Sequence, residues 1–282
     1  MASRLPLASA VRGAVLRTVK VAAAGLDLVG GPKPGVTVLI YHRVGARTGS
    51  AVDLPLPLFR DQIAYLAASG RVISLDEAVR RFGGGAGSVV PSDGVVVTFD
   101  DGTSDWPEPV MPVLTEFHVP ATFYVATSFV DGTQEFPGGG QPVSWSGLRD
   151  MVSTGFAVVG SHSHSHALLD RVDGSTARDE LDRSSRMIED RLGRPCRHFA
   201  YPKALLGSPA VEDEVRRRFE SAVLAGGRVN VPATTDPFRI WRTPIQTADG
   251  MRWFSRKAVG GMRLEGLLRE RISSTRYADS II

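Results

Sequence analysis

The sequence predicts an α/β protein, a single distorted β/α barrel with helical extensions at both ends. Short apolar runs rich in valine recur along the chain, segments of helix length separate them, and turn residues bound them. Strands that alternate with helices favour a parallel sheet with crossover helices. Roughly six to eight such units in about 230 residues fall within the range of one α/β barrel.

The first half of the chain follows this alternation closely. Residues 58–70 carry Phe59, Ile63 and Leu66 at helical spacing and end at Gly70, as a helix does. In chain order, the elements expected here are the strand 36–42 (VTVLIYH), the helix 58–70, the strand 71–74 (RVIS), the helix 75–82 (LDEAVRRF), the strand 94–102 (GVVVTFDDG), the helix 108–118 (EPVMPVLTEFH) and the strand 121–127 (ATFYVAT).

The second half continues the same rhythm. Its expected elements are the helix 144–155 (SWSGLRDMVSTG), the strand 156–162 (FAVVGSH), the helix 177–193 (ARDELDRSSRMIEDRLG), the strand 196–202 (CRHFAYP), the helix 210–219 (AVEDEVRRRF) and the strand 221–226 (SAVLAG). No repeat or linker divides the chain, so the sequence predicts one domain.

Three parts are predicted within the chain: a basic helical extension at 1–34, the barrel at 35–250 and a basic, partly helical tail at 251–282. The extension has apolar side chains at helical spacing beside Arg17 and Lys20, so it could lie on an anionic membrane. The alternative is a helix docked on its own domain or on a partner subunit. The tail could pack on the barrel, bind an anionic surface or mediate dimerisation, and the oligomeric state stays open.

Composition excludes several classes of protein. The 282 residues are 43% hydrophobic and 22% charged, unlike disordered or collagen-like chains, and a net charge of +3 in which no Lys/Arg run or aromatic-interleaved basic strip stands out argues against a nucleic-acid partner. A single cysteine, Cys196, excludes an internal disulfide and a cysteine-based zinc framework, so His and carboxylate must hold any metal. With no apolar run long enough for a signal or a membrane span, we expect a cytoplasmic protein with peripheral membrane contact at most.

Polar and ionisable residues cluster where four predicted strands end. They are His42, the pair Asp100 and Asp101, the segment 162–166 and the pair 201–202. All strands of a parallel barrel end on the same face, where active sites are built. The sequence therefore predicts that these groups converge.

Two adjacent carboxylates stand at the end of the predicted strand 94–102. Asp100 and Asp101 would repel each other after an apolar strand unless a cation or a proton resolves the conflict. Neighbouring side chains point apart, so one could bind a metal while the other acts as a base. An Asx turn or a helix N-cap is the alternative for an Asp-Asp-Gly sequence.

Three histidines alternate with serines in GSHSHSH. An extended segment would direct all three to one side, whereas a helical turn would pair His162 with His166 and turn His164 away. Gly160 and Ser161 indicate that the strand has ended, which favours the pair. A solvent-facing polar loop is the alternative.

Together, VVVTFDDG, GSHSHSHALL and FAYP resemble the polysaccharide deacetylase superfamily, the NodB-homology carbohydrate esterases of family 4, in the branch with an FAYP-type third motif. VLIYHRV, ATFYVAT and SWSGLRDMVSTG are similar as well, and the resemblance covers about residues 36–250. It implies a distorted β/α barrel that deacetylates N-acetylated sugars with one divalent metal, usually zinc and in some members nickel or cobalt.

The resemblance also implies roles for individual residues. Asp101, His162 and His166 match the metal ligands, and Asp100 matches the catalytic base. Tyr201 and Pro202 belong to the third motif, whose oxyanion-binding N–H falls on Lys203.

Two family residues are missing at their usual positions. The third motif lacks the arginine that orients the base, and Arg242 in DPFRIWRTPI is the expected substitute; a surface arginine paired with a nearby acid is the alternative. The late histidine that protonates the leaving amine is also absent, because no histidine follows His198. His42 is the expected replacement, as in members that act on exopolysaccharide glucosamine, and a packed core histidine is the alternative.

These features predict a metal-dependent hydrolase that removes an N-acetyl or N-formyl group from an amino sugar in a glycan, a glycan precursor or a glycosylated metabolite. Zinc is the expected cofactor, with nickel or cobalt as the alternatives. The other functions considered are a catalytically silent carbohydrate-binding barrel, a deacylase of a non-sugar amide, and a site that only stores or senses metal.

Overall fold

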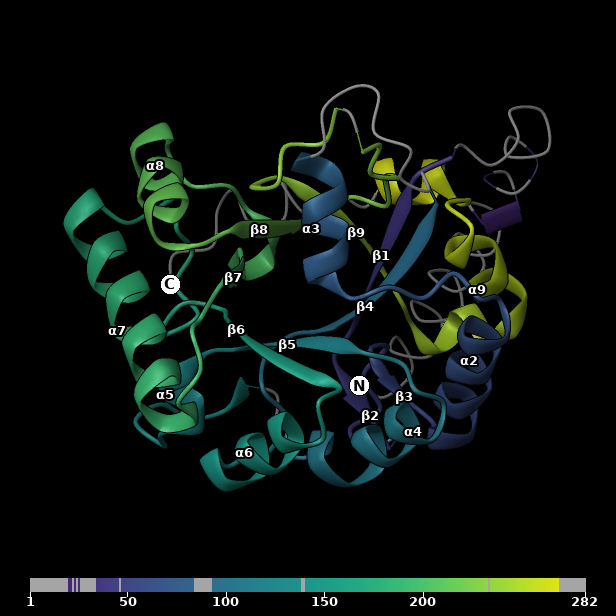
Figure 1. The fold of residues 1–282 in the computed structure, drawn as a ribbon, viewed down its shortest axis with the longest axis horizontal. Helices are drawn as coiled ribbons and strands as arrows, with labels where there is room; N and C mark the ends of the chain where they lie inside the picture. Colours follow the sequence, from purple (N-terminus) through teal and green to yellow (C-terminus); the bar gives the residue numbers. More distant parts are fainter. Residues whose placement is uncertain are drawn as a thin grey trace, which may run out of the picture.

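Seven parallel strands close into a barrel surrounded by helices, which confirms the predicted fold (Figure 1). The computed structural model describes residues 20–21, 23, 25, 34–45, 47–83, 93–137, 140–232 and 234–268. In order around the barrel, the strands are β1 (Val36–Tyr41), β4 (Gly94–Phe99), β5 (Ala121–Val125), β6 (Ala157–Ser161), β7 (His198–Ala200), β8 (Ser221–Ala225) and β9 (Ile240–Pro244).

The helical elements lie around the barrel and at its ends. They are α2 (Leu56–Ala68), α3 (Leu75–Gly83), η1 (Trp106–Val110), α4 (Met111–Glu116), α5 (Thr127–Val130), α6 (Trp145–Ser153), α7 (Gly174–Leu192), η3 (Pro202–Ala204), α8 (Pro209–Arg218), η4 (Thr247–Asp249) and α9 (Gly250–Ala258). The short strands β2 (Arg43–Val44) and β3 (Asp53–Leu54) pair separately.

Burial on both faces explains the continuous apolar strands. All six residues of β1 and of β4 are buried, one set of side chains inside the barrel and the other under the helices. Outside the barrel, the rings of Phe99 and Phe123 stack with centroids 4.8 Å apart, and Trp106 packs against both. Inside, a smaller cluster fills the barrel beneath the ends of the strands.

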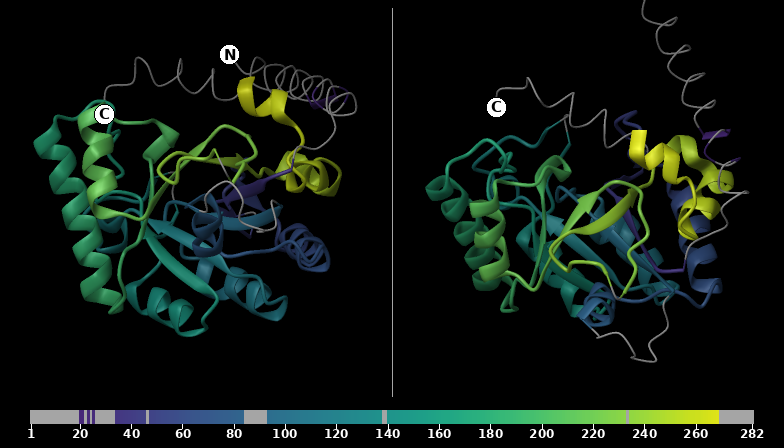
Figure 2. Two further views of the ribbon diagram at one scale, coloured as in Figure 1. Left: turned by 45° about the horizontal axis from the view of Figure 1, so that its top comes forward. Right: turned by 90° about the horizontal axis from the view of Figure 1, so that it is seen from above.

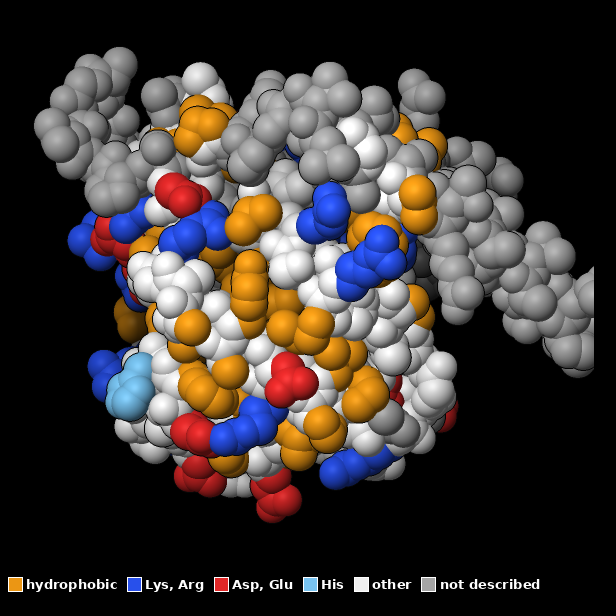
Figure 3. Space-filling model, turned by 90° about the vertical axis from the view of Figure 1, so that its right-hand side faces the viewer, with side chains coloured by type: hydrophobic (Ala, Val, Ile, Leu, Met, Phe, Trp, Pro, Cys, Tyr) orange, Lys and Arg blue, Asp and Glu red, His pale blue; other side chains and the backbone are white. Residues whose placement is uncertain are grey.

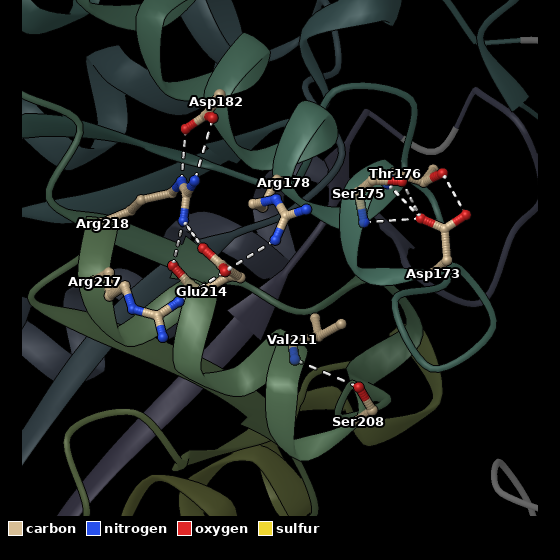
Figure 4. A network of polar contacts seen from close by, with 10 residues as sticks. All are labelled: Asp173, Ser175, Thr176, Arg178, Asp182, Ser208, Val211, Glu214, Arg217 and Arg218. Carbon is tan, nitrogen blue, oxygen red and sulfur yellow. Dashed lines mark hydrogen bonds and ion pairs between the residues drawn. The ribbon is translucent and has the colours of Figure 1, made fainter.

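Helices α7 and α8 lie side by side and are joined by charged side chains (Figures 2 and 4). Arg218 of α8 contacts Asp182 of α7 at 2.6 Å and Glu214 of its own helix at 2.5 Å. Asp173 caps the start of α7, where it accepts hydrogen bonds from two backbone N–H groups, and Gly193 ends the helix with a φ of 63°. Helix α7 therefore begins and ends where its own sequence provides the cap.

Several predicted elements differ from the observed ones. RVIS makes one isolated bridge, between Val72 and Val95, and the strand that completes the barrel is β9. The helix expected at 108–118 is the π-helical η1 followed by α4, because closely spaced prolines remove backbone donors there. The strand expected at 196–202 is shortened to β7.

The C-terminal part packs on the barrel at least as far as α9. The ring of Phe254 in α9 contacts the ring of Tyr65 in α2, with centroids 5.9 Å apart. This face of the molecule carries hydrophobic side chains scattered among charged ones (Figure 3). None of the described helices combines the length and the apolar character that a membrane span requires.

Four buried charges join the two ends of the described chain. The ammonium group of Lys20 contacts the carboxylate of Asp249 and lies 3.7 Å from Glu265, and Lys257 contacts Asp249 at 2.9 Å. Burial raises the pKa of Asp249, but the two lysines outweigh it and lower that pKa. Most of residues 1–34, for which a membrane-facing helix is one prediction, lie outside the described residues, and so does the tail beyond residue 268.

Candidate active site

The expected groups converge at the C-terminal ends of the strands. Asp100 and Asp101 follow β4, His162 follows β6, and His42 follows β1, while Arg242 lies on β9. Strand pairing brings these segments together, since β1 lies between β4 and β9 in the barrel. The site is thus assembled from residues 200 positions apart in the chain, as the barrel topology requires.

Asp101, His162 and His166 form a compact cluster of potential metal ligands. The Nε2 atoms of His162 and His166 lie 3.7 and 3.6 Å from the same oxygen of Asp101, and ligand atoms of all three lie within 4.8 Å of one another. Two ligands at about 2.1 Å from a tetrahedral zinc ion lie about 3.4 Å apart. The spacing and the donor set fit one divalent ion, and three ligands leave positions open. No other cluster of this kind occurs among the described residues.

Both histidines of the cluster favour the neutral form that binds metal. His162 donates its Nδ1–H to the carbonyl of Ala200 at 2.7 Å, which directs Nε2 toward Asp101. Burial lowers the pKa of His162. Burial, with the nearby His162, lowers the pKa of His166 to about 3.

Asp101 favours the charged form that a metal requires. Burial raises its pKa, but His42, His166 and His162 act in the opposite direction and bring the pKa to about 2. Asp101 has a φ of 83°, a left-handed conformation that a residue other than glycine rarely adopts. Such strain persists where the surroundings enforce it and is frequent at functional sites.

The loop after β6 corrects one expectation. The strand continues through Gly160 and Ser161, and His162–His166 form no helical turn. Instead Ser163 and His166 have φ values of 63° and 61°, and these left-handed residues bring the second imidazole back toward the first. The loop is anchored to α7, where Glu180 accepts hydrogen bonds from the N–H and hydroxyl of Ser165 at 2.8 and 2.7 Å.

His164 lies outside the cluster, as expected. Its Nδ1 atom is 2.8 Å from the hydroxyl of Thr127, at the start of α5. The side chain is buried and thus serves to fix the loop against its neighbour.

Asp100 is held by Arg242. The guanidinium donates two hydrogen bonds to the carboxylate, at 2.6 and 2.7 Å, and both side chains are buried. Burial raises the pKa of Asp100, but Arg242, together with His162 and His42, outweighs burial and lowers that pKa. Arg242 is 1% exposed, which excludes the alternative of a surface arginine.

His42 lies close to both carboxylates. Its proximity lowers the pKa of Asp100 and of Asp101. Its carbonyl accepts hydrogen bonds from the hydroxyl of Thr103 at 3.2 Å and from the indole N–H of Trp106 at 2.9 Å, so the end of β1 is fixed. Its Nδ1 atom is buried and has no hydrogen-bond partner in the part of the chain that the structure describes.

The third-motif segment also reaches the site. Tyr201 and Pro202 are buried at the end of β7. Lys203 is exposed and has a φ of 52°, and its charge lowers the pKa of Asp101 and of His166. The turn thus places Lys203 near the candidate metal ligands.

Two residues that contact Arg242 were not predicted from the sequence. Thr98 and Tyr124 both contact Arg242 inside the barrel. Thr98 could have been found, because it lies two positions before Asp100 and therefore shares its side of β4. Nothing in the local sequence marks Tyr124 as different from its apolar neighbours.

A cavity of about 170 Å³ is lined in part by Arg43, the residue that follows His42 in the chain. Its lining includes Arg43 of β2, Thr103 and Ser104 of the segment after β4, and Gln141 of the segment between α5 and α6. Arg43 lies with its guanidinium 5.2 Å from the ring centroid of Phe136. The cavity offers polar groups from segments adjacent in sequence to His42 and to the Asp100–Asp101 pair, and none of the candidate metal ligands lines it.

Comparison with sequence families finds a match over part of this chain. Residues 88–218 match the family described as polysaccharide deacetylase. The chitooligosaccharide deacetylase of Bradyrhizobium sp. (strain ANU 289) is 35% identical over 127 residues, which are 44% of this chain and 51% of that protein. The matched region thus spans about half the length of this curated relative.

Solved structures share the fold over most of the chain. The structure of IcaB from Ammonifex degensii is similar with a TM-score of 0.68 and 25% identity, covering 80% of this chain and 98% of that one. The Streptococcus pyogenes deacetylase PplD, in complex with acetate, gives a TM-score of 0.67 at 18% identity, covering 79% and 97%. The second likeness concerns the fold alone.

Proposed function

We propose that this chain is a member of the polysaccharide deacetylase superfamily, whose family model matches residues 88–218, and that it is a metal-dependent hydrolase that removes an N-acetyl or N-formyl group from an amino sugar. The observation that carries the proposal is the placement of the Asp101, His162 and His166 cluster beside the Asp100–Arg242 pair. A ligand cluster with open positions, a buried charged base and a nearby imidazole are what hydrolysis of an amide needs.

Asp101, His162 and His166 would hold the ion, and we propose zinc, with nickel or cobalt as the alternatives. When bound, the ion supplies Lewis-acid polarisation of the substrate carbonyl. The neutral imidazoles and the charged carboxylate present their ligand atoms without having to lose a proton first.

Asp100 is the proposed general base. Its carboxylate accepts a proton from the attacking water, whose oxygen forms the new bond to the amide carbon. Arg242 occupies both carboxylate oxygens and keeps the group charged and oriented before the reaction begins. The backbone N–H of Lys203 is the proposed donor to the oxygen on which negative charge develops.

His42 is the proposed general acid. The amide C–N bond breaks as the amine leaves, and the imidazolium of His42 donates the proton that this nitrogen needs. The products are a carboxylate and the ammonium form of the amino sugar, which carries both hydrogens of the water and the amide hydrogen, and passage of the proton from Asp100 to His42 through solvent restores both side chains. Thr103 and Trp106 hold the His42 backbone in place for this role.

The substrate is proposed to be a glycan, a glycan precursor or a glycosylated metabolite. Arg43, Thr103 and Gln141 line the neighbouring cavity, and polar side chains of this kind suit sugar hydroxyls. The cytoplasmic location and the peripheral membrane contact expected from the sequence stay predictions.

The test is release of acetate from an N-acetylglucosamine oligomer by the full chain after loading with zinc. We expect turnover that a chelator removes, that added zinc restores, and that Asp100→Ala abolishes while metal remains bound. Absence of acetate and formate release from a broad panel of amino sugars, with one metal ion bound per chain, would contradict the proposal. Sugar binding without turnover would instead support a silent carbohydrate-binding barrel, and release from simple amides alone would support a non-sugar deacylase.

A further inference from the structure

The guanidinium of Arg242 lies over the ring of Tyr124 inside the barrel. Its Cζ atom is 5.3 Å from the ring centroid, and both side chains are buried. A guanidinium over an aromatic face is attracted by the ring quadrupole, and the attraction is stronger when both groups are shielded from water. Tyr124 therefore contacts the same cation that holds Asp100.

Two further contacts fix the direction of this guanidinium. Its Nε–H donates to the carbonyl of Leu224 at 3.1 Å, and one terminal nitrogen donates to the hydroxyl of Thr98 at 3.1 Å. The guanidinium also donates to the two oxygens of Asp100. The strands β4, β5, β8 and β9 thus all contribute to the position of one side chain.

The Tyr124 ring is itself held by Gly160. The two residues are paired in register on β5 and β6. A Cβ atom at Gly160 would lie 2.8 Å from two ring atoms of Tyr124 and 2.7 Å from the carbonyl oxygen of His198. The ring therefore packs directly on the backbone of β6, two residues before His162.

The ring, and not the hydroxyl, makes these contacts. The Tyr124 hydroxyl is buried and has no hydrogen-bond partner among the described residues. A buried hydroxyl without a partner contributes no stability, and its removal costs little. Phenylalanine at this position would keep every contact described above.

We propose that Tyr124 is a positioning residue of the hydrolytic reaction. Its ring, seated on Gly160, fixes the guanidinium of Arg242 and through it the direction of the Asp100 carboxylate. The part of this inference that concerns turnover rests on the proposed function, whereas the part that concerns Arg242 does not.

The kinetic test compares Tyr124→Leu with Tyr124→Phe in the full, zinc-loaded chain. Loss of the ring should lower kcat about tenfold or more with little change in KM or in bound metal, because a misdirected base slows only the chemical step. Phenylalanine should restore the rate. Phe254→Leu, in α9, is the matched control, since it removes a buried ring that packs on Tyr65. We expect it to lower Tm without lowering kcat of the folded protein.

A second measurement needs no substrate. The Nε–H signal of Arg242, assigned by its disappearance in Arg242→Lys, reports by NMR how fast this proton exchanges with water. We expect exchange at least about tenfold faster in Tyr124→Leu than in Tyr124→Phe or Phe254→Leu.

The two measurements separate the two proposals. If the wild-type chain releases no acetate but the exchange result holds, the proposed function fails and the role of Tyr124 in fixing Arg242 stands. Equal exchange rates in Tyr124→Leu and Tyr124→Phe would overturn that role. The role would also be overturned if Phe254→Leu lowered kcat as much as Tyr124→Leu does when the two variants lose the same amount of Tm.

Discussion

Val38 of β1 pairs with Arg242 of β9, and this pairing closes the barrel. The same register carries the guanidinium of Arg242 to Asp100, at the end of β4 on the other side of β1. Closure of the fold and placement of the candidate base therefore depend on one strand, which leads to the first prediction.

Arg242→Met should destabilise the protein and abolish turnover. It leaves the Asp100 carboxylate buried without its cation, which costs about 3–5 kcal/mol in the free energy of unfolding. Urea unfolding and acetate release measure the two effects. Arg60→Met is the control, because Arg60 and Glu116 form a similar pair on the exposed surface and little change is expected there. Wild-type stability and turnover in Arg242→Met would refute this account of Arg242.

His166→Ala and His164→Ala should differ in bound metal. His166 belongs to the ligand cluster, whereas the His164 ring contacts Thr127 outside it. We expect the first variant to lose the ion and the second to keep one ion per chain, as measured by elemental analysis after dialysis. Zinc should also raise Tm in the wild type and in His164→Ala, since it binds only the folded state. Retention of zinc by His166→Ala would exclude the proposed ligand set.

His42→Gln should affect substrates according to their leaving groups. A general acid contributes about 10²–10⁴-fold where the leaving amine needs a proton. An aryl acetate, whose leaving group is stable as an anion, needs no such proton. We expect a large loss of kcat on an N-acetylated sugar and a small one on the aryl ester, with metal retained. Equal losses on the two substrates would argue for a packing role of His42.

The ion pair between Asp76 of α3 and His198, the first residue of β7, should make the free energy of unfolding depend on pH. The hydrogen bond from His198 lowers the pKa of Asp76 in the folded state, with a further contribution from Arg197. A depressed carboxyl pKa contributes stability above the unfolded value near 3.8, and the contribution is lost as the pH falls through the folded pKa. Urea unfolding between neutral and acidic pH should show Asp76→Asn less stable at neutral pH and closer to wild type in acid. A constant difference across this range would contradict the linkage.

Gly160→Ala should destabilise the barrel, because the new Cβ meets the His198 carbonyl and the Tyr124 ring at less than 3 Å. Gly174→Ala, at the start of α7, is the control, since a Cβ there meets nothing within 4 Å. We expect a clear fall in Tm for the first and none for the second. An equal Tm in the two variants would show that the backbone of β6 shifts enough to accommodate the new methyl group at residue 160.

The sequence predicts the barrel and the convergence of the site because both follow from periodic, local patterns. Valine-rich strands between helices imply a parallel sheet, and parallel strands end on one face. Asp100, Asp101 and the histidines follow such strands directly. Their expected roles come from the resemblance and stay predictions, whereas their proximity is a property of the structure.

Other features depend on contacts between distant segments. The path from His162 to His166 is set by Glu180 of α7, which the local sequence does not reveal. RVIS and the segment of β9 are similar apolar runs, and only pairing with β1 and β8 distinguishes the barrel strand. The support of Arg242 by Tyr124 likewise needs the folded register.

The buried cluster of Lys20, Lys257, Asp249 and Glu265 makes the two ends of the described chain depend on each other in an engineered chimera. Its four formal charges sum to zero, two positive and two negative. A chimera that takes only one end from a relative would leave an odd charge in the interior unless that relative has the same residue. Where the relative differs at these residues, the two segments that carry them should therefore be exchanged together.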